Sequence, residues 1–372
     1  MMNANNKVIE MHDTWLAVNS IIGCTNNCKY CFLKSTSSNH TKPIVKLSAE
    51  EAIACLFSSK YYNDKIPVCL LPNTDPFLNE ANIKYLETML KILENKKVTN
   101  PIVIITKCLI PDNFINYLSE LTSSGMQIVV YLSLSGLSTK YEPNINHENI
   151  RLNFHNLASH GIRVIHYYRP FIPDNSDASS ITNMLDFVNQ YTNISVVSGL
   201  KVKPDFIDKL EFWDITKTSK LECLNSSGVW PKEAYDYFFK NYNHKQTIFM
   251  TNSCALSQAL HKPSSYYNTD ECLNNNHCSK EQRALCAEFR KNPNKNIDKK
   301  IEELLNKIGK YNESIKIIKN ENSIVIKNAN LTIGDTAYLT FMLGQKVSIE
   351  SKKDDDNFFN SPLTNAKPYI VK

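Results

Sequence analysis

Short, apolar, β-branched runs alternate with amphipathic stretches from about residue 14 to residue 200. Because the runs are apolar at successive positions, they are typical of strands buried on both faces. The expected strands are residues 16–22, 66–71, 102–106, 126–132, 162–168 and 194–200. Strands that alternate with helices predict a parallel sheet covered by helices. We therefore predict an α/β fold, in the form of a curved, partial (β/α)6 barrel, that is, a partial TIM barrel.

Apolar residues spaced three and four apart lie between these runs and predict the helices of the barrel. The expected helices include residues 83–93, 114–121, 150–157 and 181–188. An earlier helix is expected to begin after Ser48, because Glu51 follows at the spacing of a capping box. Barrels of this kind carry their chemistry on the loops that follow the strands. The residues directly after each strand are therefore the first candidates for a functional site.

The chain contains 11 cysteines, which are unevenly spaced. An odd number without a regular pattern argues against a disulfide framework and favours metal ligation. Residues 1–13 are polar, and no apolar run approaches the roughly twenty residues of a membrane helix. We therefore expect a cytoplasmic protein with no membrane partner.

Three cysteines follow the first expected strand directly: Cys24, Cys28 and Cys31. Three thiolates on one loop can converge on one inorganic centre. A tetrahedral zinc site would need a fourth protein ligand, whereas a [4Fe–4S] cluster held by three cysteines leaves one iron open to a small molecule. A zinc knuckle or metal-free cysteines are the alternatives.

The spacing CxxxCxxC, with Tyr30 before the last cysteine, resembles the signature of the radical SAM superfamily. The resemblance implies a partial barrel and a [4Fe–4S] cluster whose open iron binds S-adenosylmethionine (SAM). It also implies that reductive cleavage of SAM gives a 5′-deoxyadenosyl radical, which abstracts a substrate hydrogen. A reductant such as flavodoxin or ferredoxin and sensitivity to oxygen follow from the same resemblance.

The second expected strand leads into Asn73-Thr74-Asp75-Pro76. This segment resembles the TDPY segment of the DNA-repair-photolyase-like group, relatives of spore photoproduct lyase. In the superfamily this loop meets the methionyl ammonium of SAM, and the resemblance assigns that role to Asn73 and Asp75. A carboxylate suits a cation. An Asx-Pro turn that only closes the strand is the alternative.

The third expected strand ends in Thr106-Lys107, which also resembles that group. Lys107 is a candidate for neutralising the cofactor carboxylate or the substrate, or else an exposed lysine. Cys108 follows and is the candidate catalytic residue, as a donor of a hydrogen atom. A small buried apolar residue is the usual fate of a lone cysteine and is the alternative.

The fourth and fifth strands supply further candidates. Ser133, Glu142-Pro143 and Arg151 follow the order found in the photolyase-like group. The resemblance places Ser133 at the ribose or carboxylate of SAM and Arg151 at the carboxylate, with a solvated arginine as the alternative for Arg151. Arg169, at the end of the fifth strand, is expected to face the mouth of the barrel and meet an anionic substrate.

A second group of cysteines lies beyond the barrel: Cys254, Cys272, Cys278 and Cys286. Four thiols can hold an auxiliary [4Fe–4S] cluster or a zinc ion, and a group without metal is the third possibility. The spacing matches neither the SPASM nor the twitch pattern of radical SAM proteins.

The chain is expected to divide into three parts: a barrel over residues 1–215, a Cys-rich segment over 216–291, and an appendage over 292–372. The appendage is expected to contain a charged helix at 292–310. Alternating apolar residues predict its four strands, at 315–318, 323–326, 337–341 and 346–349.

The net charge of +5 permits a nucleic-acid partner without requiring one. The resemblance favours a radical SAM enzyme that acts on a nucleic acid or nucleotide. Modification of a peptide or a small metabolite in natural-product maturation is the alternative substrate class. A zinc-binding nucleic-acid module without enzymatic activity is the alternative from another functional class.

Overall fold

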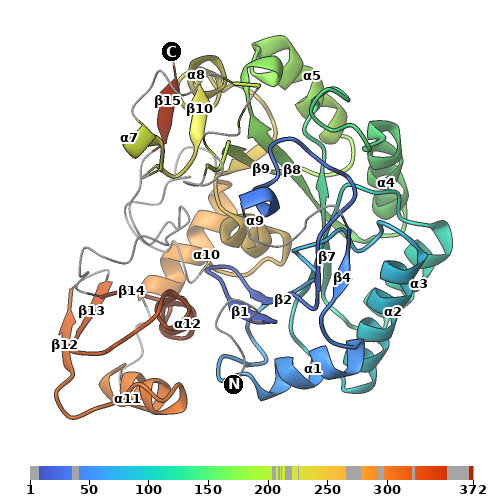
Figure 1. Cartoon of the computed structure of the whole chain (residues 1–372). Coiled ribbons are helices and arrows are strands. Elements are labelled where there is room, and N and C mark those ends of the chain that lie inside the picture. Colours follow the sequence, from blue (N-terminus) through green and yellow to red (C-terminus); the bar gives the residue numbers. More distant parts are fainter. Residues whose placement is uncertain are drawn as a thin grey trace.

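The structure is a computed structural model (Figure 1). It describes residues 8–35, 42–202, 207, 210, 212–213, 220–224, 226–264, 278–291, 297–320, 323–349 and 368–371. Every structural statement below concerns these residues.

The helices of the barrel region are α1 (Ala49–Ser58), α2 (Glu80–Asn95), α3 (Asp112–Ser123), α4 (His147–Ser159) and α5 (Ala178–Val188), with 3-10 turns η1 (Phe32–Ser35) and η2 (Pro173–Asn175). Further along the chain lie α7 (Lys220–Leu224), α8 (Lys232–Phe239), α9 (Asn252–Ala259), α10 (Lys280–Lys291), α11 (Ile297–Lys307) and α12 (Ile333–Leu343).

The strands are β1 (Ile9–Met11), β2 (Leu16–Val18), β3 (Ile21–Ile22), β4 (Ile44–Val45), β5 (Val68–Leu70), β6 (Ile102–Thr106), β7 (Ile128–Ser133), β8 (Arg163–Phe171), β9 (Ile194–Gly199), β10 (Val229–Pro231), β11 (Thr247–Phe249), β12 (Lys316–Lys319), β13 (Ser323–Lys327), β14 (Lys346–Ile349) and β15 (Tyr369–Val371).

One eight-stranded sheet forms the barrel, in the order β1-β2-β5-β6-β7-β8-β9-β11. From β2 to β11 every neighbouring pair is parallel, and only the edge strand β1 runs antiparallel, to β2. The predicted α/β fold with a curved parallel sheet is confirmed. Each of the six predicted strands overlaps a strand of this sheet, and β7 and β8 extend beyond the predicted ends at 132 and 168. Strand β1 and the seventh parallel strand, β11, were not predicted.

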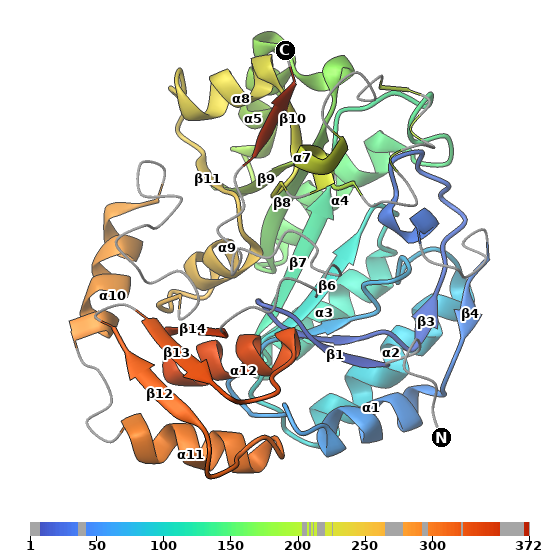
Figure 2. The ribbon, with the colours of Figure 1, turned by 60° about the vertical axis from the view of Figure 1, so that its left-hand side comes forward.

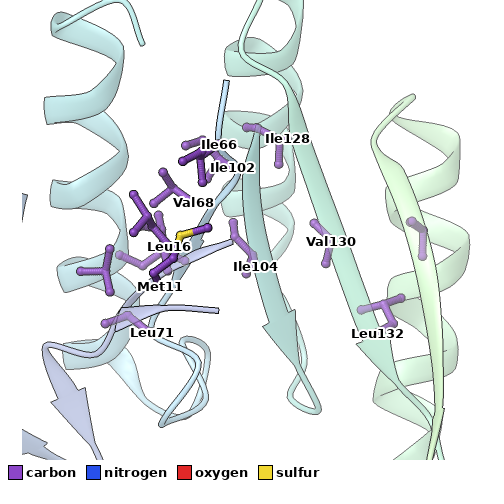
Figure 3. Close-up of a cluster of buried hydrophobic side chains, with 14 of the residues drawn as sticks. Met11, Leu16, Ile66, Val68, Leu71, Ile102, Ile104, Ile128, Val130 and Leu132 are labelled. Atoms are coloured by element: carbon purple, nitrogen blue, oxygen red, sulfur yellow. The ribbon is translucent and has the colours of Figure 1, made fainter. Parts of the chain in front are cut away.

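Alternate residues of each strand point to opposite faces of the sheet. One face packs against helices α1 to α5 through side chains such as Leu16, Val68, Ile104 and Val130 (Figure 3). The other face carries a separate apolar cluster, which includes Cys69, Tyr131 and Tyr167 from the strands together with part of α9. We call this second face the inner face. Helices α1 to α5 therefore lie on one side of the sheet and α9 on the other (Figure 1).

The first barrel helix begins as predicted. Ser48 accepts a hydrogen bond from the backbone N–H of Glu51, and the Glu51 carboxylate accepts one from the N–H of Ser48. This reciprocal pair satisfies two backbone donors that the first helical turn leaves without partners. It also fixes the point at which the chain leaves β4 and enters α1.

The appendage contains the three-stranded sheet β12-β13-β14 and helices α11 and α12. The predicted strand at 337–341 is wrong, because these residues lie inside α12. A capping box between Thr332 and Asp335 begins this helix, and Gly344, with φ of 67°, ends it in the left-handed conformation. These two signals outweigh the β-branched and aromatic residues between them.

Helix α12 docks the appendage on the edge of the barrel (Figure 2). The buried carboxylate of Asp335 accepts hydrogen bonds from Lys60 Nζ at 2.7 Å and from the Tyr61 hydroxyl at 2.9 Å. Lys310 Nζ lies 3.8 Å from the same carboxylate. A buried acid with two cationic neighbours therefore joins the end of α1 to the start of α12.

Close to the chain's end, strand β15 pairs in parallel with β10. No helix among the described residues has the length and apolar character needed to cross a membrane.

Candidate active site

The first three cysteines lie on a loop at the carboxyl end of β2, where the carboxyl ends of the parallel strands meet. Gly23 begins this loop with φ of +105°, and a Cβ atom there would lie 2.4 Å from the Lys42 carbonyl oxygen. Only glycine tolerates this combination of backbone angle and close contact. We call residues 23–31 the cysteine loop.

Two other strand-end loops hold the cysteine loop in place. The Gly23 N–H donates to the Asn73 carbonyl at 3.0 Å, which joins it to the loop after β5. The Lys29 N–H donates to the Tyr141 carbonyl at 2.9 Å, and Asn144 Nδ2 donates to the Thr25 carbonyl at 2.8 Å. Backbone partners on separate elements fix the loop at several points, so the thiols are held by the sheet and not by their own segment alone.

All three cysteines of this loop remain as thiols, and each is buried or half-buried. Burial raises the pKa of Cys24 and of Cys28 to about 12 and also raises the pKa of Cys31. The three sulfurs lie close enough for each pair to interact electrostatically. Such thiols stay protonated at neutral pH unless a metal takes the place of the proton.

Three converging thiols and a nearby cation fit a [4Fe–4S] cluster. Lys107 acts on the pKa of both Cys28 and Cys31, so its charge lies where it would offset the negative charge of three thiolates and a cluster. Within the described parts of the chain, no three His, Cys, Asp or Glu side chains gather tightly enough to hold a single metal ion. A cluster differs from such a site because each thiolate binds a different iron.

Asp75 is buried in the loop after β5 and organises the neighbouring strand end. Its Oδ1 accepts hydrogen bonds from the Thr106 hydroxyl at 2.7 Å and from the Phe77 N–H at 3.0 Å, while Oδ2 accepts from the Lys107 N–H at 2.7 Å. Burial raises the pKa of Asp75, and these hydrogen bonds oppose the rise. The carboxylate thus holds the turn that carries Lys107 and Cys108. Asn73 lies half-buried in the same loop, with its carbonyl bound to Gly23.

Glu142 is the centre of the site, although no role was predicted for it from the sequence. Its fully buried carboxylate accepts hydrogen bonds from Tyr30, from Lys107 at 2.7 Å, from Ser135 at 2.8 Å and from His147 at 2.6 Å. These partners come from the cysteine loop, the end of β6, the segment after β7, and the start of α4. One carboxylate therefore joins four segments of the chain.

Burial acts to raise the pKa of Glu142, but the charge of Lys107 and the hydrogen bonds of His147, Lys107 and Tyr30 lower it to about 2. The reverse holds for Lys107: burial opposes its charge, and the nearby Glu142 raises its pKa. Lys107 Nζ also donates to the Ser133 carbonyl at 3.3 Å and lies 5.7 Å from the centre of the Tyr30 ring. Both members of this buried pair are therefore charged at neutral pH.

Cys108 lies beside the cysteine loop. Asn26 Nδ2 donates to its sulfur at 3.4 Å, and the charge of Cys24 contributes to its raised pKa, although burial is the larger cause. The candidate catalytic thiol is therefore half-buried next to the first cysteine of the motif, and its sulfur faces the loop.

Ser133 and Arg151 differ in how the structure places them. Ser133 is the last residue of β7 and is buried, with its carbonyl bound to Lys107. Arg151 lies on α4 with its guanidinium 4.2 Å from the centre of the Phe187 ring on α5 and 3.6 Å from Glu148. The structure therefore brings Ser133 into the network around Glu142 and gives Arg151 contacts between two helices.

Of the second cysteine group, Cys254, Cys278 and Cys286 are described, whereas Cys272 lies outside the described residues. Ser264 connects two of them: its hydroxyl lies 3.9 Å from the Cys254 sulfur, and its N–H donates to the Cys286 sulfur at 3.4 Å. Gln282 Nε2 donates to Cys286 at the same distance. Cys278 packs against the apolar cluster of the inner face. The three thiols thus lie around α9 and α10 on that side of the sheet.

A family comparison matches residues 18–188 of this chain to the radical SAM superfamily. The matched part contains the cysteine loop, Asp75, Lys107 and Glu142. No curated protein matches this chain.

Solved structures that are similar to part of this chain include the following three. Spore photoproduct lyase complexed with dinucleoside spore photoproduct is 10% identical with a TM-score of 0.41, covering 53% of this chain and 59% of that one. SuiB of Streptococcus suis bound to S-adenosylmethionine is 16% identical with a TM-score of 0.43, covering 66% and 53%. A radical SAM methyltransferase from Sphaerobacter thermophilus is 15% identical with a TM-score of 0.37, covering 54% and 65%. The chain thus spans less than two thirds of the length of each of these three proteins.

Proposed function

We propose that this chain is a radical SAM superfamily enzyme, as the match of residues 18–188 supports, and that it abstracts a hydrogen atom from its substrate at the carboxyl end of the sheet. The family implies a [4Fe–4S] cluster and SAM. Cys24, Cys28 and Cys31 are the residues that would hold the cluster. The observation that carries the proposal is one loop with three thiols, held by the loops of neighbouring strands.

When bound at these thiols, a cluster would supply the electron for reductive cleavage of the C5′–S bond of SAM to methionine and a 5′-deoxyadenosyl radical, and that radical would take a hydrogen atom from the substrate. The chain's own residues position the reactants. Tyr30 and Lys107 are held by Glu142 beside the cysteine loop, and we expect them to contact the cofactor together with Asn73 and Ser133.

The contacts that the structure gives Asp75 and Arg151 bear on their predicted roles at the cofactor. We propose that Asp75 acts indirectly, by positioning Lys107, because both of its oxygens are bound within the protein. Arg151 stays a predicted contact with the SAM carboxylate, and it would need to leave the Phe187 ring to make it.

We propose Cys108 as the residue that returns a hydrogen atom to the substrate radical. Its half-buried sulfur lies beside Asn26 on the cysteine loop, which is the position that the role needs. A chain whose substrate radical is instead quenched by a recovered 5′-deoxyadenosine would not need this thiol.

The substrate that we propose is a nucleic acid or nucleotide, on the basis of the segment around Asp75 and the net charge of +5. A peptide or small metabolite is the alternative. A nucleic acid would bind through phosphate contacts, so its affinity would fall steeply with salt. Affinity of the holoprotein for a DNA duplex and for a single strand, measured from low to moderate salt, therefore separates the two substrate classes.

We also propose an auxiliary [4Fe–4S] cluster at Cys254, Cys272, Cys278 and Cys286, supported by the two N–H donors to the Cys286 sulfur. Such donors stabilise the negative charge of cluster sulfurs. Three further expectations stay predictions: the division of the chain at residues 215 and 291, a reductant such as flavodoxin or ferredoxin, and a cytoplasmic location.

Anaerobic reconstitution with iron and sulfide tests the proposed function. We expect broad absorption near roughly 400 nm and, after reduction with SAM present, formation of 5′-deoxyadenosine. The Cys28→Ala variant should not form that product. The Cys55→Ala variant should still form it, because Cys55 is a half-buried cysteine on α1, outside the cysteine loop. A colourless protein that binds zinc would overturn the proposal.

Iron content tests the auxiliary cluster. The wild type should hold about eight irons per chain and a Cys254→Ala/Cys286→Ala variant about four, because each cluster contains four irons. Equal iron in both proteins would contradict the second cluster while leaving the first in place.

A further inference from the structure

Arg169 is a cation that has no anionic partner among the residues that the structure describes. It lies near the end of β8, half-buried, with its guanidinium 3.8 Å from the centre of the Tyr167 ring. Across the described residues, its guanidinium makes neither an ion pair nor a hydrogen bond. A guanidinium presents five N–H donors, and a half-buried one normally meets a carboxylate, a phosphate or a carbonyl.

The hydroxyl of Tyr167 is a second polar group without a partner. The side chain is only 1% exposed, and its oxygen is one of the buried atoms that lack a hydrogen bond in the described structure. Buried hydroxyls are almost always bonded, so an unbonded one directly beside an unpaired cation calls for an explanation. Both groups are donors, and both would be satisfied by one oxyanion.

Aromatic side chains of the inner face lead to this pair. The Tyr131 ring lies 4.6 Å from that of Tyr167, and the Trp15 ring lies 5.9 Å from that of Tyr131. All three belong to the apolar cluster of the inner face. In an apolar setting a charged hydrogen bond gains strength, because water competes for it less.

The charge of Arg169 acts on the inner face of the sheet, and it also acts to lower the pKa of Lys107, although the net effect of burial and Glu142 is a raised pKa. Arg169 influences the pKa of Cys69, Tyr131 and Tyr167, which all belong to the inner face, although burial is the larger cause for each. Lys107 influences Cys28 and Cys31 of the cysteine loop. Lys107 is thus already paired with Glu142, whereas Arg169, which is close enough to act on Lys107, has no acidic partner among the described residues.

We propose that Arg169 and the Tyr167 hydroxyl form an anion subsite on the inner face, which binds a carboxylate or phosphate group of the substrate. The guanidinium provides two parallel donors for the oxyanion, and the phenol provides a third. The proposal rests on the proposed function, since it assigns the substrate of that same site. It applies equally to a nucleotide phosphate and to a peptide or metabolite carboxylate.

The test uses the reconstituted holoprotein and two aryl anions, phenyl phosphate and benzoate, with phenol as the neutral control. Calorimetric titration should show that the wild type binds at least one anion and binds phenol more weakly. Arg169→Gln should weaken anion binding at least about tenfold, and Arg169→Lys less, because lysine keeps the charge but not the bidentate geometry. Tyr167→Phe should weaken it about twofold to fivefold.

Two further titrations identify the source of the anion. Saturating SAM should leave phenyl phosphate or benzoate binding intact, and the affinity for SAM should be the same within about twofold in Arg169→Gln and in the wild type. If SAM displaces the aryl anion, or if Arg169→Gln loses SAM binding, the subsite belongs to the cofactor carboxylate and the substrate assignment is overturned. The assignment also fails if the wild type binds neither anion, or if Arg169→Gln binds them as well as the wild type does.

Failure of the proposed function has its own signature. It would appear as absence of 5′-deoxyadenosine from the wild type after reduction with SAM, whatever the anion titrations show. Unchanged circular dichroism and SAM affinity in Arg169→Gln would exclude misfolding as the cause of lost anion binding.

Discussion

Lys107 and Arg169 are two cations at the ends of strands in the same sheet, and they differ in what surrounds them. Lys107 reaches the buried carboxylate of Glu142 at 2.7 Å and the Ser133 carbonyl at 3.3 Å. Arg169 contacts an aromatic ring and, within the described chain, no acid. The first cation has a carboxylate and a carbonyl as partners in the protein, and the second has neither among the described residues.

This difference indicates that Lys107 stabilises the fold, whereas Arg169 is available to bind a ligand. A buried ion pair is costly to desolvate, so it persists where several hydrogen bonds satisfy both charges, as they do at Glu142. An unpaired, half-buried cation makes no such contribution to the folded state. We expect the Lys107 region to respond to substitution with large losses of stability and Arg169 to respond with a loss of binding alone.

Glu142→Gln should cause the largest loss of stability among the variants proposed here. It leaves Lys107 buried without a counter-charge, which typically costs about 3–5 kcal/mol of unfolding free energy. Urea unfolding of the reduced protein under anaerobic conditions measures this change. The double variant Lys107→Met/Glu142→Gln should recover part of the loss, since it removes both charges, and purely additive losses would contradict the coupling.

The stability gap between the wild type and Glu142→Gln should depend on pH. The pKa of Glu142 is about 2 in the folded protein, compared with an ordinary value of 4.5. Because the folded value is the lower one, the carboxylate stabilises the fold fully above about pH 4.5, and this contribution is lost as the pH falls toward 2. The gap amounts to about 3 kcal/mol at neutral pH and should shrink through that range. Unfolding curves at several pH values would refute this if the gap stayed constant.

Tyr30→Phe should have a smaller effect. It removes one O–H donor to the Glu142 carboxylate and leaves the ring, so about 2 kcal/mol of stability should be lost. Thermal unfolding of the reduced protein provides the measurement. Tyr85→Phe is a matched control, because the Tyr85 hydroxyl donates only to the Leu47 carbonyl and its loss should cost about 1 kcal/mol. Equal losses would argue against a special role of the carboxylate network.

Arg169→Gln should change stability least, by less than about 1 kcal/mol, which is the size of an exposed or partly exposed cation–π contact. The same urea unfolding experiment measures it beside Glu142→Gln. A loss as large as that of Glu142→Gln would show that Arg169 is part of the framework, and the contrast between the two cations would then disappear.

Much of the barrel could be predicted from the sequence because its strands are buried on both faces and therefore read as apolar runs. Residues 102–106 were predicted with the bounds that the structure gives them. β11 was not found in this way, because its apolar run comprises only Ile248 to Met250, whereas the equally short β5 lies in the longer apolar run at 66–71. The helix α12 was missed because its apolar and β-branched residues suit a strand, and the decisive cap of Thr332 and Asp335 lies before them.

The site could be predicted in part. The cysteine motif, Lys107 and Ser133 were predicted because each lies at the end of a strand or shortly after it, and the structure brings Lys107 and Ser133 into contact. Glu142 does not, and its importance depends on four segments that meet only in the folded chain. Its signal in the sequence was the Glu-Pro pair after β7, which carried no assigned role. No local sequence pattern could show that Arg169 lacks an acidic partner among the described residues, because this depends on which residues surround it in the folded chain.

The docking of α12 on β1 has a consequence for how the chain folds during its synthesis. Strand β1 lies at the edge of the barrel sheet, and α12, which packs against it, is made more than 300 residues later. At about 5–20 residues per second, this edge waits on the order of tens of seconds for its cover. Uncovered strand edges invite pairing with other chains. The nascent protein therefore depends on Asp335 reaching Lys60 and Tyr61 to close an edge that its own N-terminal half leaves open.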